Sequence, residues 1–202
     1  LLNKLWGDRS NQSVESIMIH IVGLGGVGFW LAVGLTHAIP ANTIQCWDDD
    51  TLTGGTGATR LPWAPPSTTK TELLRGYLMM VHGDSVLPTF INRRFSGISG
   101  INEGDTVIDC TDMANDTRKR MWTIARKHGA RLLRVSYDGR GSMLVVSTGL
   151  PLFAPGPGGY AAIPSLSLSL AAGGVGAEPL KRYLDHPTPS FTFALSIEEA
   201  MK

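Results

Sequence analysis

Short apolar runs alternate along the chain with segments whose apolar residues recur at helical spacing. The run at 17–22 is apolar except at His20 and ends in glycine, as a buried parallel strand does. Residues 29–38 follow with helical spacing, and Pro40 lies just past their end. Because this alternation continues, the pattern predicts an α/β fold: a Rossmann-like, mostly parallel sheet with helices on both faces. Further strands are expected at 43–47, 86–95, 105–110, 131–136, 141–147 (which could be antiparallel) and 190–195, and further helices at 70–82 and 115–128.

The alternation weakens toward the C-terminus. A loop of Gly and Pro is predicted at 151–164. Residues 165–184 are rich in small side chains and could be a packed helix, although Pro179 argues against a regular one. Since 202 residues suit one domain, we expect residues 1–149 to form the nucleotide-binding core and residues 150–202 to complete the same domain.

Composition and charge exclude several classes of protein. With 18 Lys and Arg against 17 Asp and Glu, the net charge of +1 gives no support to a nucleic-acid-binding surface. No apolar run reaches the roughly 20 residues that cross a bilayer, and no signal peptide opens the chain, so we expect a soluble, cytoplasmic protein without nucleic-acid or membrane partners. The two cysteines, Cys46 and Cys110, are too few for an all-cysteine zinc site or a disulfide framework, and we interpret both as core thiols. His20 is interpreted as a buried, hydrogen-bonded residue.

A glycine-rich turn joins the first predicted strand to the first predicted helix, with Gly23, Gly25, Gly26 and Gly28 in the order G-L-G-G-V-G. Backbone N–H groups at a helix N-terminus favour phosphate, and missing side chains let the phosphate approach. The turn therefore predicts a nucleotide-phosphate loop. The alternative is that these glycines only allow the strand and the helix to pack tightly.

Acidic residues end the next predicted strands. Asp48 lies 20 positions after Gly28, where dinucleotide-binding folds place the acid that bonds a ribose hydroxyl. Asp109 and Asp112 end the strand at 105–110, and such a pair suits a Mg-nucleotide, because Mg²⁺ takes one or two carboxylates together with phosphate oxygens. A hydride-transfer site has little use for this pair. The alternatives are a solvated turn after Asp48, a loop cap at Asp109 and a helix cap at Asp112.

Taken in order, four segments resemble the E1-like activating enzymes, the ThiF/MoeB type of adenylyltransferase. They are the strand with its glycine loop, Asp-Asp-Asp-Thr-Leu at 48–52, Lys70 at the start of a helix, and Val-Ile-Asp-Cys-Thr-Asp at 107–112. The resemblance covers roughly residues 17–150. It implies a homodimeric enzyme that binds ATP and Mg²⁺ and adenylates the C-terminal carboxylate of a small ubiquitin-like or sulfur-carrier protein, often one that ends in Gly-Gly.

The resemblance also implies a role for each site residue. Asp48 would hold the ribose, with Asp50 beside it at the nucleotide, and Asp112 would hold Mg²⁺. Arg60 and Lys70 would bind the phosphates. Cations there would stabilise the charge that builds on the α-phosphoryl group and the departing pyrophosphate, so Arg60, Lys70 and Asp112 are the predicted catalytic residues.

The sequence departs from the family pattern in several respects, among them a loop sequence and the cysteines. The loop at 55–60 reads Gly-Thr-Gly-Ala-Thr-Arg, where the family usually has Ser-Asn-Leu-x-Arg-Gln. The Cys-x-x-Cys pairs that many members use for zinc are absent, and no cysteine follows Cys110. These departures leave a second hypothesis open: the chain is a degenerate relative of the family that binds a nucleotide or a partner without turnover. An NAD-binding oxidoreductase is the third hypothesis.

Overall fold

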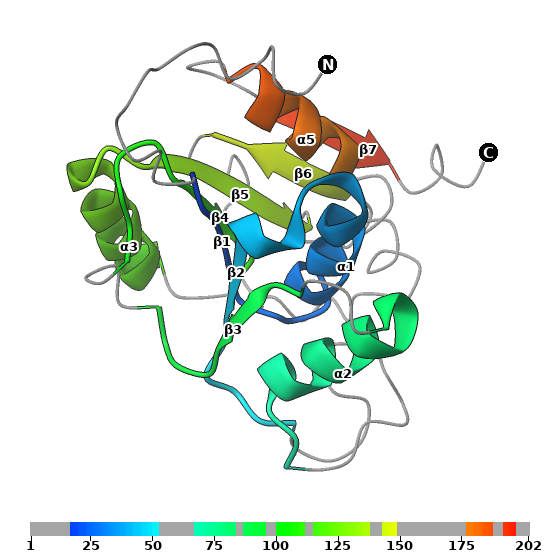
Figure 1. The fold of residues 1–202 in the computed structure, drawn as a ribbon. Helices are drawn as coiled ribbons and strands as arrows, with labels where there is room; N and C mark the ends of the chain where they lie inside the picture. The colour runs from blue at the N-terminus through cyan, green and yellow to red at the C-terminus, as the bar shows by residue number, and fades with distance from the viewer. Residues whose placement is uncertain are drawn as a thin grey trace, which may run out of the picture.

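The computed structural model describes residues 17–52, 67–83, 87–95, 100–111, 115–137, 143–148, 177–187 and 192–196. Strands of this part of the chain form one seven-stranded sheet in the order β3-β2-β1-β4-β5-β6-β7 (Figure 1). The strands are β1 (Ile19–Val22), β2 (Ile44–Trp47), β3 (Thr89–Ile91), β4 (Thr106–Asp109), β5 (Arg131–Tyr137), β6 (Met143–Ser147) and β7 (Thr192–Ser196). The α-helices are α1 (Gly28–Ala38), α2 (Lys70–His82), α3 (Asn115–Lys127) and α5 (Ala177–Asp185), and the short 3₁₀ helix η2 is Ala41–Thr43.

The sheet is parallel from β3 to β5, whereas β6 and β7 are antiparallel additions at one edge. The chain moves outward from β1 in one direction through β2 and β3 and in the other through β4 and β5. The order therefore reverses between β1 and β4. In open α/β sheets, ligands bind outside the carboxyl ends of the strands at such a switch point. The predicted α/β, mostly parallel architecture is confirmed, including the antiparallel strand at 141–147.

Helices cover both faces of the sheet (Figure 1). On one face, Phe29 of α1, Leu74 of α2 and Leu180 of α5 join a single apolar cluster with alternate residues of the strands. On the other face, α3 packs through Trp122 and Ala125 onto a second cluster. Apolar residues on both sides of the same strands explain why these strands read as continuous apolar runs.

Local sequence explains where two of the helices begin. Thr69 caps α2: its Oγ1 accepts the N–H of Glu72, and the Glu72 carboxylate accepts the N–H of Thr69, so this helix starts at Lys70 as predicted. The expectation that Pro179 prevents a regular helix is wrong. Pro179 is the third residue of α5, in the first turn, where N–H groups have no partner within the helix and proline is tolerated. The predicted loop at 151–164 lies outside the described residues.

Three predictions about the core are confirmed. Cys46 is fully buried, and the half-buried Cys110 packs against the same apolar cluster. His20 is fully buried, and its Nε2 lies 3.1 Å from Oδ2 of Asp105. None of the helices in the described segments is long and apolar enough to cross a membrane.

Candidate functional site

The glycine loop lies at the switch point, directly after β1, and packing explains two of its glycines. Gly23 has φ +90°, and an added Cβ would lie 2.9 Å from Cγ2 of Thr111. At Gly28 an added Cβ would lie 1.8 Å from the carbonyl oxygen of Gly23. Both positions therefore require glycine for the fold itself, as the packing alternative proposed.

At the start of α1, the described residues show no side-chain cap at the N-cap position. Gly25 is half-buried, and its carbonyl oxygen accepts the N–H of Phe29 at 3.1 Å. No side chain caps the helix at Val27, and its first turn holds no acidic residue. The positive end of the helix dipole is thus not neutralised by a side chain of α1, which suits an anionic ligand.

Asp48, at the end of β2, holds the glycine loop in place. Its Oδ2 accepts the N–H of Leu24 at 2.6 Å, and its Oδ1 accepts the N–H of Asp50 at 2.8 Å. Burial raises the pKa of Asp48 above its usual value, and the charge of Lys70 and these two hydrogen bonds oppose that rise only in part. The sequence placed Asp48 near a ribose. The structure adds a contact that the sequence did not show: the carboxylate is bonded to the loop.

Lys70 reaches the same point from the start of α2. Its N–H donates to the carbonyl of Asp50 at 3.1 Å. Its Nζ lies 2.5 Å from Oδ2 of Asp50 and 3.5 Å from Oδ2 of Asp48. Burial alone would lower the pKa of Lys70, but the hydrogen bond to Asp50 and the charges of both aspartates raise it above its usual value. Lys70 is 9% exposed, so it is a buried cation beside the glycine loop and not a surface lysine.

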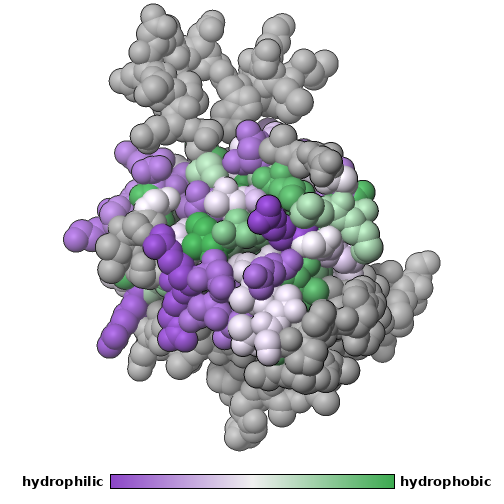
Figure 2. All heavy atoms as spheres, turned by 60° about the horizontal axis from the view of Figure 1, so that its bottom comes forward, coloured by the Kyte–Doolittle hydropathy of each residue, from purple (hydrophilic) through white to green (hydrophobic). Residues whose placement is uncertain are grey.

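The three consecutive aspartates bring their carboxylates together at the end of β2. One oxygen from each of Asp48, Asp49 and Asp50 lies within 4.8 Å of the others, close enough to share a cation. Asp49 also lies 3.3 Å from Nε of the exposed Arg94. Figure 2 brings forward the lower side of Figure 1, where α2 lies, and hydrophilic side chains gather over part of that face. The sequence assigned no role to Asp49 or Arg94.

At the end of β4, Asp109 is engaged inside the protein. Its Oδ1 accepts the N–H and the hydroxyl of Thr111 at 2.9 and 2.6 Å, and its Oδ2 accepts Nη1–H of Arg134 at 2.9 Å. Asp109 is fully buried. The alternative that it caps a loop is therefore confirmed, and a metal would have to displace these bonds to use it. Arg134 was missed by the sequence analysis, because no motif includes it.

Two predicted catalytic residues, Arg60 and Asp112, lie outside the described residues. Of the predicted nucleotide-binding residues, the structure brings together the glycine loop, Asp48, Asp50 and Lys70 around the carboxyl ends of β1 and β2. The roles of these residues toward a nucleotide remain predictions.

Comparison with known proteins gives a likeness in fold. No protein-family model matches the sequence, and no curated protein matches it. Solved structures of MccB from E. coli superpose on 91% of this chain at 13% identity, with TM-scores of 0.66 for MccB alone, 0.65 for its complex with MccA and 0.64 for its complex with ATP. The chain spans 60–65% of the length of MccB in these structures, which is less than two thirds. At this identity the similarity shows a shared fold.

Proposed function

We propose that this chain is the core of an ATP-dependent adenylyltransferase of the E1-like type, which activates a C-terminal carboxylate. The observation that carries the proposal is the buried Lys70, held by Asp48 and Asp50 beside the glycine loop at the switch point, where α1 has no side-chain cap at Val27. The fold likeness supports it, since MccB structures with ATP and with MccA adopt the same fold. In this proposal residues 1–149 form the adenylation core, and residues 150–202 complete it.

The residues present fit a triphosphate. The start of α1 offers backbone donors at the positive end of its dipole, and Lys70 offers a cation that is already paired with carboxylates. When ATP enters, Lys70 would exchange its contact with the exposed Asp50 for a phosphate oxygen, while Asp48 keeps the loop fixed through Leu24. Asp112 would hold Mg²⁺, which when bound neutralises charge on the phosphate oxygens.

In the proposed reaction, a carboxylate oxygen of the substrate attacks the α-phosphorus of ATP. A new P–O bond forms as the bond to the departing pyrophosphate breaks, so no proton transfer is required. Lys70 and Arg60 would stabilise the charge that develops on the phosphates. The resemblance in sequence favours a small ubiquitin-like or sulfur-carrier protein ending in Gly-Gly as the substrate and a homodimer as the active assembly. The complexes of MccB with MccA agree with a substrate presented by a separate chain.

ATP–pyrophosphate exchange with candidate carrier proteins tests this function. Lys70→Ala should lower exchange by about 10²-fold or more, the scale of one lost electrostatic contact in the transition state. Lys181→Ala is the matched control, because Lys181 also pairs with an aspartate, at 2.8 Å, but lies on α5. Exchange by the control variant should equal that of the wild type. Calorimetry on the wild type adds a test that does not depend on a variant: tighter binding of NAD than of Mg-ATP would overturn the proposal.

A further inference from the structure

A charged side chain lies in the middle of β5, inside the protein. Arg134 is 2% exposed and is among the largest fully buried side chains. It stands opposite Asp109 in the pairing of β5 with β4. A buried guanidinium is costly unless a charged partner and further hydrogen bonds compensate it. The role of Arg134 therefore has to be read from its contacts.

Those contacts converge on one residue of the turn after β4. Nη1 of Arg134 donates to Oδ2 of Asp109 at 2.9 Å, and Nη2 lies 3.4 Å from the carbonyl oxygen of Thr111. Asp109 in turn accepts both the N–H and the hydroxyl of Thr111. Thr111 is thus held at its backbone N–H, its carbonyl and its side chain by a single buried ion pair.

Thr111 also forms a wall of the glycine loop. A Cβ placed on Gly23 would lie 2.9 Å from Cγ2 of Thr111 and 3.2 Å from the carbonyl carbon and oxygen of Cys110. The first glycine of the loop therefore packs directly against the segment that the ion pair holds. Any movement of Thr111 would change the space between the ends of β1 and β4, where the switch point lies.

We infer that Arg134 is a positioning residue for the nucleotide site: acting through Asp109, it fixes Thr111, the residue before Asp112, against the glycine loop. The inference rests on the proposed function, because it assumes that a nucleotide binds at this loop. The rival explanation is that the pair only stabilises the core. Stability alone is a weak reason for a buried ion pair, since apolar replacements of similar volume are often as stable.

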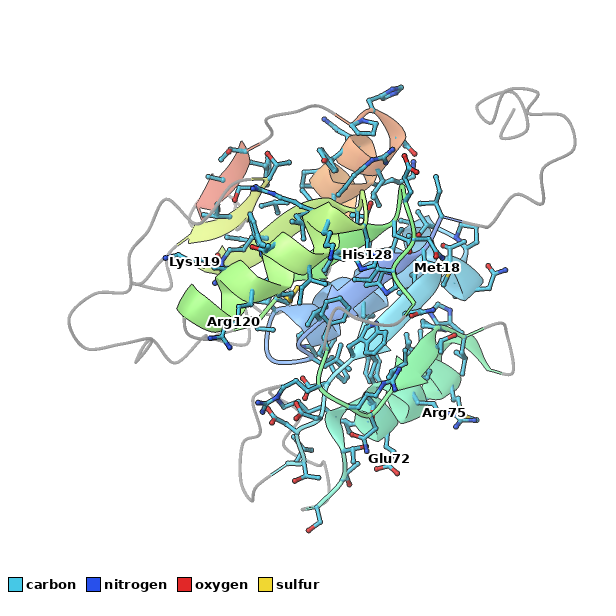
Figure 3. All side chains as sticks on the ribbon, turned by 90° about the vertical axis from the view of Figure 1, so that its left-hand side faces the viewer. Met18, Glu72, Arg75, Lys119, Arg120 and His128 are labelled. Carbon is cyan, nitrogen blue, oxygen red and sulfur yellow. The ribbon has the colours of Figure 1, made fainter. Side chains whose placement is uncertain are left out.

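The chain contains a second buried pair that serves as a matched control for the explanation that the Arg134–Asp109 pair only stabilises the core. His20 and Asp105 form a second buried pair in the same sheet, 3.1 Å apart, with side chains 0% and 2% exposed. Asp105, just before β4, lies at the amino ends of the central strands and accepts the N–H of Met18, whereas the glycine loop follows the carboxyl end of β1. In Figure 3, Met18, whose N–H bonds Asp105, lies to the right, as does His128 just after the end of α3. Lys119 and Arg120, in the first half of α3, lie to the left. Removing either pair should weaken the core, but only one of them borders the loop.

The experiment compares Arg134→Met with His20→Leu in the full chain, by calorimetry with Mg-ATP well below each melting temperature. We expect Arg134→Met to raise the Kd of ATP by about 10- to 100-fold, the usual effect of removing a residue that orients a binding group. His20→Leu should leave it within about twofold, although both variants are less stable. Arg134→Lys keeps a positive charge next to Asp109 but lacks the second guanidinium nitrogen, Nη2, that lies near the Thr111 carbonyl, so it should raise the Kd by an intermediate factor. It also serves as the test if Arg134→Met does not fold.

Amide hydrogen exchange at Thr111 gives a readout that needs no nucleotide. It should accelerate by about tenfold or more in Arg134→Met and stay at the wild-type rate in His20→Leu. If Arg134→Met loses stability but keeps both its ATP affinity and its Thr111 exchange rate, the inference is wrong. If wild-type protein binds no ATP while Thr111 exchange accelerates as expected, the proposed function fails, and the nucleotide role of Arg134 fails with it.

Discussion

Replacing Gly28 with alanine tests whether α1 and the glycine loop pack so closely that no side chain fits at this position. The new Cβ would lie 1.8 Å from the carbonyl oxygen of Gly23 and 3.0 Å from Cβ of Cys110. Ordinary contact would need α1 to move away from the loop by about 1.5 Å. The obstacle is backbone, and it is held in place, since the N–H of Gly23 donates to the carbonyl of Trp47 at 2.9 Å.

The cost follows from the size of this overlap. Forcing one extra carbon into a packed site usually costs about 1–3 kcal/mol. Because a fixed carbonyl cannot turn aside as a side chain can, we expect Gly28→Ala to fall at the upper end, near 3 kcal/mol, and to lower the melting temperature by roughly 6–12 °C. The displaced start of α1 should also weaken ATP binding.

Gly76→Ala is the matched control for this variant. Gly76 lies inside α2, and a Cβ there would meet nothing within 4 Å. Alanine is the better helix former, so this change should stabilise the protein by about 0.5–1 kcal/mol. Thermal and urea unfolding followed by circular dichroism measures both variants. A Gly28→Ala protein as stable as the wild type would refute the packing argument, because α1 would then have room that the structure does not show.

Three further predictions concern single side chains. Asp112→Asn should lower pyrophosphate exchange by about 10²-fold or more while ATP binding weakens less, and a variant with full exchange would remove Asp112 from the site. Burial raises the pKa of the Cys46 thiol, which is fully buried, so iodoacetamide at pH 8 should modify it only after denaturation, and mass spectrometry of the folded protein would reveal any earlier labelling. Hydrogen bonds from the Thr69 hydroxyl and N–H lower the pKa of Glu72, so the stability they add is present at neutral pH and is lost as the pH falls through the folded-state pKa. Glu72→Gln should flatten this part of the pH dependence of unfolding, and Thr69→Ala should cost about 1 kcal/mol; an unchanged acid limb in Glu72→Gln would contradict the assignment.

The elements of the fold could be predicted where local chemistry marks their ends. α2 runs from Lys70 to His82 as predicted, because Thr69 and Glu72 form a capping box and Gly83, with φ +67°, ends the helix. At Pro179 the same kind of reasoning failed, since it treated proline as a breaker without fixing where the helix starts. A proline in the first turn carries no penalty, so the start of α5 decided the outcome.

The sequence predicted which described residues come together at the candidate site, but it did not predict their contacts. Sequence spacing placed the glycine loop and Asp48 at neighbouring strand ends, and the family resemblance added Lys70 at the start of a helix. It could not show that Asp48 would bond Leu24, or that Lys70 would be buried between two carboxylates. The first contact depends on the register of β1 against β2, and the second depends on where the start of α2 lies at the end of β2. The structure therefore shows that Asp48, predicted only as a ribose ligand, also shapes the loop.

The ion pair of Arg134 depends on the register between β4 and β5, which the sequence alone does not give. A charge between the apolar residues Leu133 and Val135 of a strand already indicates an internal partner, since a lone buried guanidinium is too costly. Alternation places Arg134 on the same face as Leu132, which packs with α3, but it does not say which residue of the next strand stands opposite. A shift of one residue in the register of β4 and β5 would put Ile108 there instead of Asp109 and leave both charges unpaired. The ion pair and the register therefore require each other, and the segment that carries Thr111 toward the glycine loop depends on both.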